Sequence, residues 1–154
     1  MGRLKLKLPE KDSHLYTQSY GLRIDDINYG GHLSNDRFLC LCHDARVNFL
    51  KHREMTEMNC YGRGLVMNEA QIVYKGEGFQ ADEIFIEMYL GDLSRTGFEL
   101  FYHIKRRTPS PRELGRVKTG QAFFDFDKRK LSPLENEDQV EEFRQLLTDL
   151  RRER

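Results

Sequence analysis

The second half of the chain contains long stretches in which apolar and polar residues alternate, and one long amphipathic segment precedes them. The alternating stretches are residues 64–78, 82–92, 95–106 and 115–127. A period of two residues is typical of a strand with one buried face. The turns between the later stretches are short, which favours an antiparallel meander. The run from Ile84 to Leu90 is apolar on both faces apart from Glu87, as expected of a central strand.

Apolar residues in the preceding segment recur at spacings of three and four. They are Phe38, Leu41, Cys42, Ala45 and Phe49. This spacing predicts a helix of about five turns with a wide apolar face, and Ser34, Asn35 and Asp36 are candidate N-caps. A face this wide needs a broad partner, which a curved sheet supplies. With a further strand predicted at residues 15–27, we expect an α+β domain whose antiparallel sheet wraps around one long helix.

The chain of 154 residues is expected to form one main domain with an addition at each end. We predict a flexible N-terminal arm at residues 1–14, the domain at residues 15–134 and an amphipathic C-terminal helix at residues 135–154. The apolar stripe of that helix consists of Val140, Phe143, Leu146, Leu147 and Leu150. Acidic residues lead the helix and basic residues close it, in agreement with the helix dipole. We expect it to pack on the domain by one face; a membrane-surface helix is the alternative.

Charge and composition restrict the classes of partner. Lys and Arg number 25, as do Asp and Glu, so no net charge draws the chain to nucleic acid or to an anionic membrane. No apolar run approaches the roughly 20 residues of a membrane span, and the first residues lack a signal-peptide pattern. Cys40, Cys42 and Cys60 fit reduced thiols, and the first two point about 200° apart on a helix, so they cannot share a metal ion. We therefore expect a cytoplasmic protein without a metal site or a cofactor.

The most unusual chemistry lies in the turn before the predicted helix. The turn reads Asn28-Tyr29-Gly30-Gly31-His32-Leu33-Ser34-Asn35, and the helix continues with Asp44-Ala45-Arg46-Val47-Asn48-Phe49-Leu50. These motifs and the order of elements resemble the hotdog-fold acyl-CoA thioesterases of the 4-hydroxybenzoyl-CoA thioesterase-like group. That family typically has an Asp-x-x-Gly-His-x-x-Asn turn and then a helix with an acidic-Ala-Arg-x-x-Phe-Leu segment. The resemblance covers roughly residues 15–134, so the C-terminal helix is an addition to the family pattern.

The resemblance implies a hotdog fold and a thioesterase site, with one departure. Asn28 stands where the family most often has a catalytic aspartate. An amide cannot take up a proton, so Asn28 would instead donate a hydrogen bond to the thioester carbonyl or hold the attacking water. His32 would polarise the carbonyl or cap the helix, and a structural role within the turn is the alternative.

The base would then be another carboxylate, and four candidates lie nearby. If the strand stays extended, Asp26 shares a face with Asn28, whereas Asp25 points the other way. Asp36 is best explained by its favourable place in the first turn of a helix. Asp44 lies about 120° from the middle of the apolar stripe, where a partner subunit could cover it. Asp26 and Asp44 are therefore equal candidates for the base, and a site without a local base is the remaining alternative.

Other residues of the turn are expected to bind the substrate. The backbone of Gly30 and Gly31 leads into a helix N-terminus and would offer N–H groups to the carbonyl oxygen, although a tight turn alone also explains two glycines. Asn35 would tie the turn to a neighbouring strand or act as an N-cap, and Tyr29 would border the acyl pocket or shield the turn. The basic segment 105–116 would grip the phosphates of coenzyme A or form solvated surface.

These observations predict an acyl-CoA thioesterase that hydrolyses its substrate with water at a site on a dimer boundary. Exposed sheet edges favour pairing, and hotdog domains resemble one another in dimerising edge to edge, so we expect a homodimer or a homotetramer. The main alternative is a hotdog module that binds acyl-CoA or a fatty acid without catalysis, which Asn28 favours. A dehydratase of the same fold has less support, because the turn is closer to that of the thioesterases.

Overall fold

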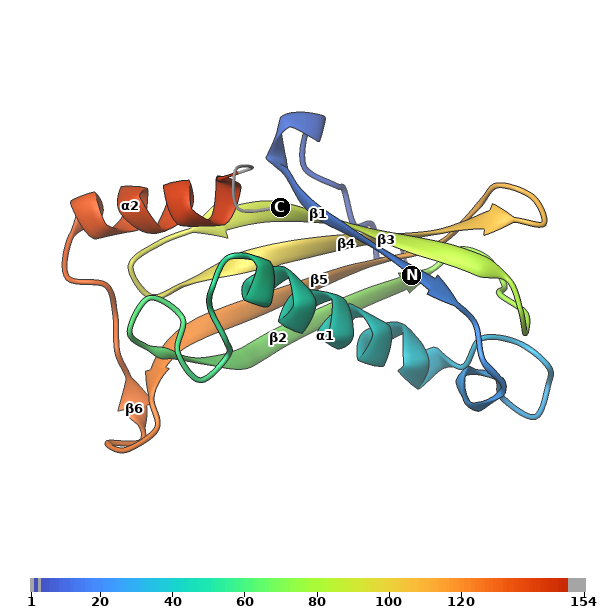
Figure 1. Ribbon diagram of the computed structural model, residues 1–154, viewed down its shortest axis with the longest axis horizontal. Helices are drawn as coiled ribbons and strands as arrows, with labels where there is room; N and C mark the ends of the chain where they lie inside the picture. Colours follow the sequence, from blue (N-terminus) through green and yellow to red (C-terminus); the bar gives the residue numbers. More distant parts are fainter. Residues whose placement is uncertain (1, 3, 150–154) are drawn as a thin grey trace.

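A computed structural model describes residues 2 and 4–149, and it shows one antiparallel sheet curled around a long helix (Figure 1). In chain order the elements are β1 (His14–Gly21), α1 (Asn35–His52), β2 (Gly64–Tyr74), β3 (Glu83–Leu93), β4 (Gly97–Thr108), β5 (Arg112–Asp125), β6 (Lys130–Leu131) and α2 (Glu137–Thr148). Two 3-10 turns, at Lys11–Ser13 and Ile24–Asp26, flank β1. The predicted α+β class and the single long helix inside a curved sheet are confirmed.

The sheet has the strand order β1-β3-β4-β5-β2, and the short strand β6 pairs with β5. All its pairings are antiparallel, and β3 lies between β1 and β4, as its two-sided apolar pattern predicted. Strands β1 and β2 form the two edges of this order. The middle of β2, residues 68–70, is exposed, so this edge is open to solvent in the single chain.

The core fills the space between α1 and the inner face of the sheet. Helix α1 has 18 residues, which is five turns, and its predicted apolar stripe is buried. The inner face of the sheet adds to the same core cluster Ile84, Ile86, Met88, Leu100, Tyr102, Ile104 and Val117, none of them exposed. Burying one such large apolar side chain stabilises the fold by roughly 1.5–3 kcal/mol. The wide apolar face of α1 is therefore buried because the sheet curls around it, and the inner face of the sheet is buried because α1 fills the curve.

The strand predicted at residues 15–27 ends at Gly21, so its second half was predicted wrongly. Residues Ile24–Asp26 form a 3-10 turn instead, and Ile24 is 67% exposed. The turn is held by Asp26, because its Oδ2 accepts the backbone N–H of Arg23 at 2.9 Å. A carboxylate that bonds a nearby backbone N–H offers the chain an alternative to the sheet ladder. Asp26 and Asn28 therefore do not share the face of an extended strand.

Helix α2 packs by one face against the end of the core. Val140, Phe143 and Leu147 are buried, whereas Leu150 and the basic residues after it lie outside the described part. The ring of Phe143 lies 5.2 Å from that of Phe98 and 5.3 Å from that of Phe123, centroid to centroid. The expected packing by one face is thus found for Val140, Phe143 and Leu147, whereas Leu146, also in the predicted stripe, is only partly buried.

A buried arginine joins the elements beneath α2. Arg53 follows α1 directly and is fully buried. Its Nε donates to the carbonyl of Leu147 at 2.9 Å, and its Nη2 donates to the carbonyl of Leu15 at 3.0 Å. One side chain therefore holds the end of α1, the end of α2 and the start of β1 together.

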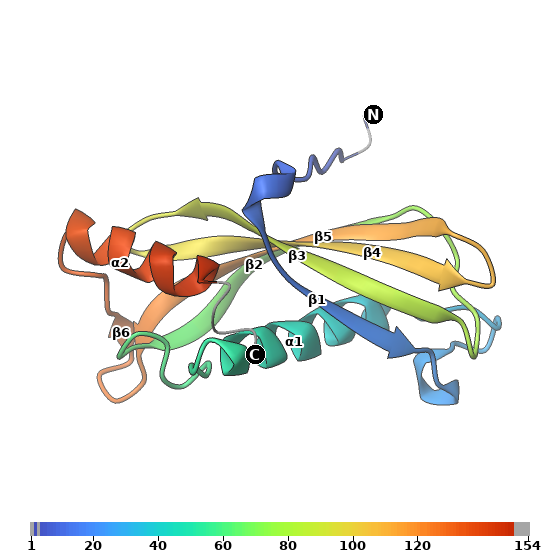
Figure 2. The ribbon, with the colours of Figure 1, turned by 45° about the horizontal axis from the view of Figure 1, so that its top comes forward.

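The N-terminal arm crosses the sheet on the face opposite α1 (Figure 2). Leu6 is buried there, and its carbonyl accepts a hydrogen bond from Arg116 Nη1 at 3.1 Å. The predicted flexibility of this arm stays a prediction.

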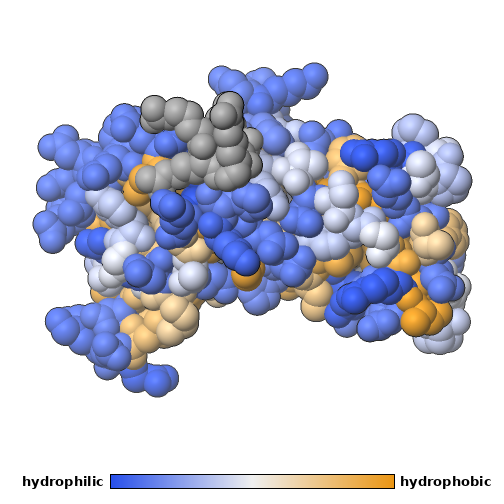
Figure 3. Space-filling model, in the orientation of Figure 1, coloured by the Kyte–Doolittle hydropathy of each residue, from blue (hydrophilic) through white to orange (hydrophobic). Residues whose placement is uncertain are grey.

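The surface is mostly hydrophilic in the view of Figure 3, and apolar side chains gather at the end where the loop before α1 lies. Ile24, and Phe79 at 40% exposure, are among the exposed apolar residues. Among the described residues, no helix has the length and apolar character needed to cross a membrane.

Candidate active site

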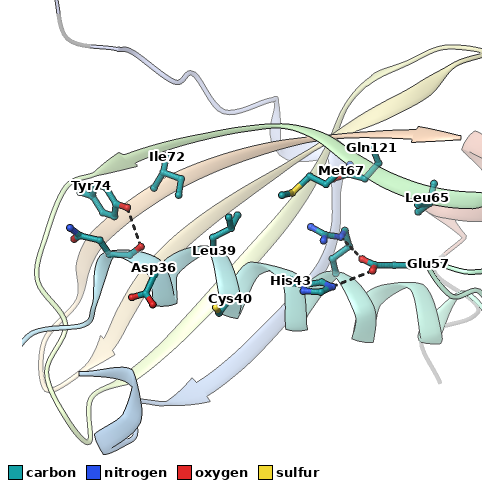
Figure 4. A pocket seen from close by; sticks show the side chains of 12 residues that line it. Asp36, Leu39, Cys40, His43, Glu57, Leu65, Met67, Ile72, Tyr74 and Gln121 are labelled. Carbon is teal, nitrogen blue, oxygen red and sulfur yellow. Dashed lines mark hydrogen bonds and ion pairs between the residues drawn. The ribbon is translucent and has the colours of Figure 1, made fainter. Parts of the chain in front are cut away.

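A cavity of about 600 Å³ lies between α1 and the edge strand β2 (Figure 4). Helix α1 lines it with Asn35, Asp36, Leu39, Cys40, His43 and Arg46, and the rest of the lining is Glu57, Leu65, Met67, Ile72, Tyr74 and Gln121. Asp36 and Tyr74 lie at one end of the cavity, whereas His43 and Glu57 lie at the other. The arrangement is an apolar channel with a polar group at each end, as small-molecule sites commonly have.

The first end of the cavity coincides with the start of α1. Ser34 is the N-cap residue in an extended conformation, and its side chain makes no capping hydrogen bond. The backbone N–H of Asn35 donates to no acceptor in residues 4–149, as is usual for the first turn of a helix. The carbonyl of Asn35 accepts the Tyr74 hydroxyl at 3.0 Å, which ties this turn to β2. The cavity therefore begins at a free amide and the positive end of a helix dipole.

The glycine turn before the helix uses its own N–H groups internally. Asn28 Oδ1 accepts the N–H of Gly30 at 3.0 Å and that of His32 at 3.2 Å. The N–H of Gly31 donates to the carbonyl of Asn28 at 3.0 Å, and Gly31 has a φ of 86°, which suits glycine. The N–H groups expected to serve the carbonyl oxygen are thus bonded within the turn. Asn28 is exposed and supplies the acceptor oxygen that a carboxylate would supply there.

His32 and Tyr29 lie outside the cavity lining. The ring of His32 packs on Phe79 at 5.2 Å between centroids, and its Nδ1 lies 3.5 Å from a carboxylate oxygen of Glu77. The side chain of Tyr29 is fully exposed. In the single chain, His32 thus contacts the loop between β2 and β3, and Tyr29 contacts solvent.

Asp26 is buried and already paired. It is 1% exposed, and its Oδ1 accepts two hydrogen bonds from Arg37, at 3.1 Å from Nε and 2.9 Å from Nη2. Its carbonyl accepts the N–H of Ser34 at 2.9 Å. The role that the structure gives to Asp26 is to fix the loop to the first turn of α1. Asp25 is exposed beside it.

Asp44 lies on the flank of α1 that faces β1, whereas the cavity lies on the flank that faces β2. The Tyr20 hydroxyl donates to Asp44 Oδ2 at 2.7 Å, and the Asn48 amide donates to the same atom at 3.3 Å. Burial and this bond to Asp44 raise the pKa of the Tyr20 hydroxyl far above its usual range. Asp44 does not line the cavity of this chain.

Two other carboxylates do line the cavity, one at each end. The exposed Asp36 accepts a hydrogen bond from the Ser34 hydroxyl, and this bond is the main cause that lowers its pKa. At the other end, burial tends to raise the pKa of Glu57, but hydrogen bonds from Arg46 (2.8 Å) and His43 (3.2 Å) lower it overall. Both groups are thus ionised at neutral pH.

Sequence reasoning missed Glu57 because it lies in the loop after α1, outside every motif. The available signal was Arg46, in the Asp44-Ala45-Arg46 segment, which is 5% exposed and requires an anionic partner. Of the expected site residues, the structure brings only Asn35 to the cavity, joined there by Asp36.

The basic segment 105–116 is largely paired. Lys105 forms an ion pair with Glu87, Arg107 with Glu83, and Arg116 with Glu113. Arg112 has no ion-pair partner within residues 4–149. It lines a groove of about 1040 Å³ together with Lys5, Lys7 and Lys75, and this groove shares Tyr74 with the cavity.

The fold matches many solved structures. A 1,4-dihydroxy-2-naphthoyl-CoA thioesterase from Synechocystis superposes with a TM-score of 0.74 at 21% identity, over 88% of this chain and 97% of that one. The dynemicin thioesterase superposes with a TM-score of 0.69 at 20% identity, over 83% of this chain and 93% of that one. A gentisyl-coenzyme A thioesterase superposes with a TM-score of 0.62 at 16% identity, over 70% of this chain and 88% of that one. At these identities the likeness shows the hotdog fold.

By sequence alone the chain matches no curated protein at a significant level. A family model does match it, over residues 22–145, a range that contains the whole cavity lining. With the hotdog fold in place and most of its length matched by that model, the chain belongs to the thioesterase-like superfamily.

Proposed function

We propose that this protein is an acyl-CoA thioesterase whose substrate carbonyl lies at the start of α1. The observation that carries the proposal is the free N–H of Asn35, placed where an apolar cavity begins. The carbonyl oxygen would accept this N–H, and the acyl group would extend past Leu39 and Ile72. Developing negative charge on that oxygen would gain from the amide and from the helix dipole.

In the proposed reaction, water attacks the carbonyl carbon. Asp36 is the carboxylate beside the free amide, and it is ionised at neutral pH, so it would accept one proton of that water. The C–S bond then breaks, and the leaving thiolate takes the proton from Asp36. The products are a carboxylic acid and free coenzyme A. The roles predicted for Asp26 and Asp44 as the base stay predictions, and the geometry of the single chain favours Asp36.

The groove beside the cavity supports coenzyme A as the carrier. Lys75 and Arg112 would meet its phosphates, and Tyr74 would separate them from the acyl group. The open edge of β2 supports assembly into a homodimer or a homotetramer, with the cavity near the subunit boundary. A partner would then cover the exposed side of α1 and β2.

The second candidate function is binding of acyl-CoA or a fatty acid without hydrolysis. Two observations favour it: an amide, Asn28, stands in the turn, and the nearest acid in that loop, Asp26, is neutralised by Arg37. A binder needs the cavity but no base.

Free-thiol release from a panel of acyl-CoA esters distinguishes the two candidates. The proposal expects turnover that Asp36→Asn lowers strongly, while Asp44→Asn and Asn28→Ala retain it. If Asp26→Asn or Asp44→Asn abolishes turnover in a folded protein and Asp36→Asn does not, the base is assigned wrongly. Tight binding of every ester without thiol release would favour the binder.

A further inference from the structure

At the end of the cavity away from the start of α1, the guanidinium of Arg46 keeps one nitrogen without a partner. Arg46 is only 5% exposed and lines the cavity. Its Nε donates to Glu57 Oε1 at 2.8 Å, and its Nη1 donates to the hydroxyl of Tyr102 at 3.1 Å. Nη2 donates to no acceptor in residues 4–149, yet it is not sealed from solvent. Since the side chain is otherwise enclosed, the cavity is where a ligand can reach Nη2.

The guanidinium of Arg46 is held in one orientation. Two of its nitrogen atoms are bonded, and the Tyr102 hydroxyl that accepts one of them is itself bonded to Thr119 at 2.8 Å. Glu57, which accepts the other, is also held by His43 at 3.2 Å. A planar group that is anchored at two corners presents its third corner without a further loss of side-chain freedom. Nη2 is therefore a donor that is in place before a ligand binds.

The charges around this donor nearly balance, because Arg46 is paired with Glu57. A carboxylate on a ligand would be attracted by the guanidinium but repelled by Glu57, and it would lose its hydration shell. An ammonium group would lie beside the positive charge of Arg46. A neutral oxygen accepts the N–H groups without adding a charge. This end of the cavity therefore suits a neutral hydrogen-bond acceptor.

We infer that the cavity selects acyl groups that carry a neutral acceptor oxygen, such as an oxo group, far from the thioester, and that Arg46 Nη2 recognises it. The inference rests on the proposed function, because that function places the thioester carbonyl at Asn35. A chain of methylene groups alone would displace water from Nη2 and leave its N–H groups unpaired, which is costly. An oxo group would replace the lost hydrogen bond, and a charged donor makes a stronger bond than a neutral one.

The position of the oxygen along the acyl chain follows from α1. The helix rises about 12 Å from Asn35 to His43. The guanidinium of Arg46 lies level with the ring of His43, because both bond the same carboxylate. An extended chain advances roughly 1.2 Å per bond, so at most about ten bonds span this distance, and a hydrogen bond at each end shortens it. Carbons 7 and 9 fall in this range, whereas carbon 5 would lie between Leu39 and Ile72, in the apolar middle of the channel (Figure 4).

The test compares decanoyl-CoA with its 5-oxo, 7-oxo and 9-oxo derivatives on the native protein, by free-thiol release. The three oxo esters have the same length and composition, so a preference among them reports the position of the oxygen and not hydrophobicity. We expect the 7-oxo or the 9-oxo ester to have a kcat/KM at least about 10-fold above that of decanoyl-CoA, and the 5-oxo ester to fall below it. If the 5-oxo ester is the best of the three, or if no oxo ester exceeds decanoyl-CoA, the inference is overturned.

A matched pair of variants assigns the preference to its residue. Arg46→Lys keeps a positive charge beside Glu57 and removes Nη2, so the ratio of kcat/KM between the best oxo ester and decanoyl-CoA should fall to about one. Arg95→Lys makes the same exchange at a side chain that bonds the carbonyl of Leu134 and does not line the cavity, so it should keep the native ratio. A native ratio in folded Arg46→Lys would show that another group recognises the oxygen and would overturn the assignment. If Arg46→Lys does not fold, the double variant Arg46→Met with Glu57→Met removes the whole ion pair and is held to the same expected ratio.

A binding measurement separates failure of this inference from failure of the proposed function. If none of the four esters is hydrolysed, the proposed function fails, and calorimetry with decanoate and the three oxodecanoates still reports on the cavity. Tighter binding of 7-oxodecanoate or 9-oxodecanoate than of decanoate, lost in Arg46→Lys and retained in Arg95→Lys, supports the inference. Equal affinities for decanoate and the oxodecanoates contradict it.

Discussion

Replacing Asn35 by proline should remove one hydrogen atom of catalytic importance and leave the fold intact. Asn35 is the first residue of α1, the position where proline is best tolerated in a helix. The preceding residue, Ser34, has φ −68° and ψ 144°, which is the conformation that a residue before proline adopts. The N–H that proline lacks has no acceptor in residues 4–149. Proline here therefore breaks no hydrogen bond of the described fold.

The expected loss of activity follows from the role of that N–H. If it stabilises the developing oxyanion, its removal should lower kcat by about 10²–10³-fold, equivalent to roughly 2.7–4 kcal/mol. A donor used only in the transition state should affect kcat more than KM. The assay is thiol release from the best ester of the panel, with the thermal midpoint of each variant measured by circular dichroism.

Asn35→Ala is the matched control for this variant. It removes the side chain and keeps the backbone N–H, so it should retain close to native kcat. Asn35→Pro should keep the native thermal midpoint or raise it slightly, because proline reduces the freedom of the unfolded chain. A folded Asn35→Pro protein with native kcat would refute the assignment of the oxyanion site.

Three further predictions concern stability. Phe143→Ala should lower the free energy of unfolding by roughly 3–5 kcal/mol, measured by denaturant titration, because it leaves a cavity at a fully buried site among aromatic rings. A loss below about 1 kcal/mol would mean that α2 does not pack on the core. Arg53→Met should cost about 2–5 kcal/mol by the same measurement, since two buried carbonyls lose their donors; an unchanged midpoint would contradict this. The pKa of Glu57 is lowered in the folded state. The ionised Glu57 side chain therefore contributes fully to the free energy of unfolding above the unfolded pKa of about 4.5, and this contribution is lost as the pH falls through the lower folded pKa. Glu57→Gln should therefore flatten the fall in stability below about pH 4.5, and equal slopes for the native protein and the variant would contradict the pairing with Arg46 and His43.

The long elements could be predicted from the sequence because their periodicity reports burial directly. The stripe of α1 and the alternation in β3, β4 and β5 each reflect one face turned to a shared core. The end of β1 could not be predicted in this way, because Leu22 and Ile24 continue the alternation into the 3-10 turn. The 3-10 turn that follows the strand is held by Asp26, which accepts the backbone N–H of Arg23 and is itself bonded by Arg37, eleven residues away.

The candidate site was harder to predict because it depends on which flank of a helix faces which strand. Asp36 and Asp44 are both acidic residues of α1, and only the packing of β1 and β2 decides that Asp36 reaches the cavity. The turn motif gave the right location for the start of the helix. It did not reveal that Asn28 accepts the N–H groups of Gly30 and His32, whereas the N–H of Asn35 has no acceptor among the described residues.

The central claim is that a thioester carbonyl binds at the start of α1, in the cavity toward β2. The most direct measurement is the amide nitrogen–proton spectrum of the native protein, titrated with a non-hydrolysable acyl-CoA ketone in which a methylene replaces the thioester sulfur. Our account predicts that the Asn35 amide shows a large downfield proton shift, together with changes at Leu39 and Ile72. Saturation by the ketone with the Asn35 amide unmoved would contradict it.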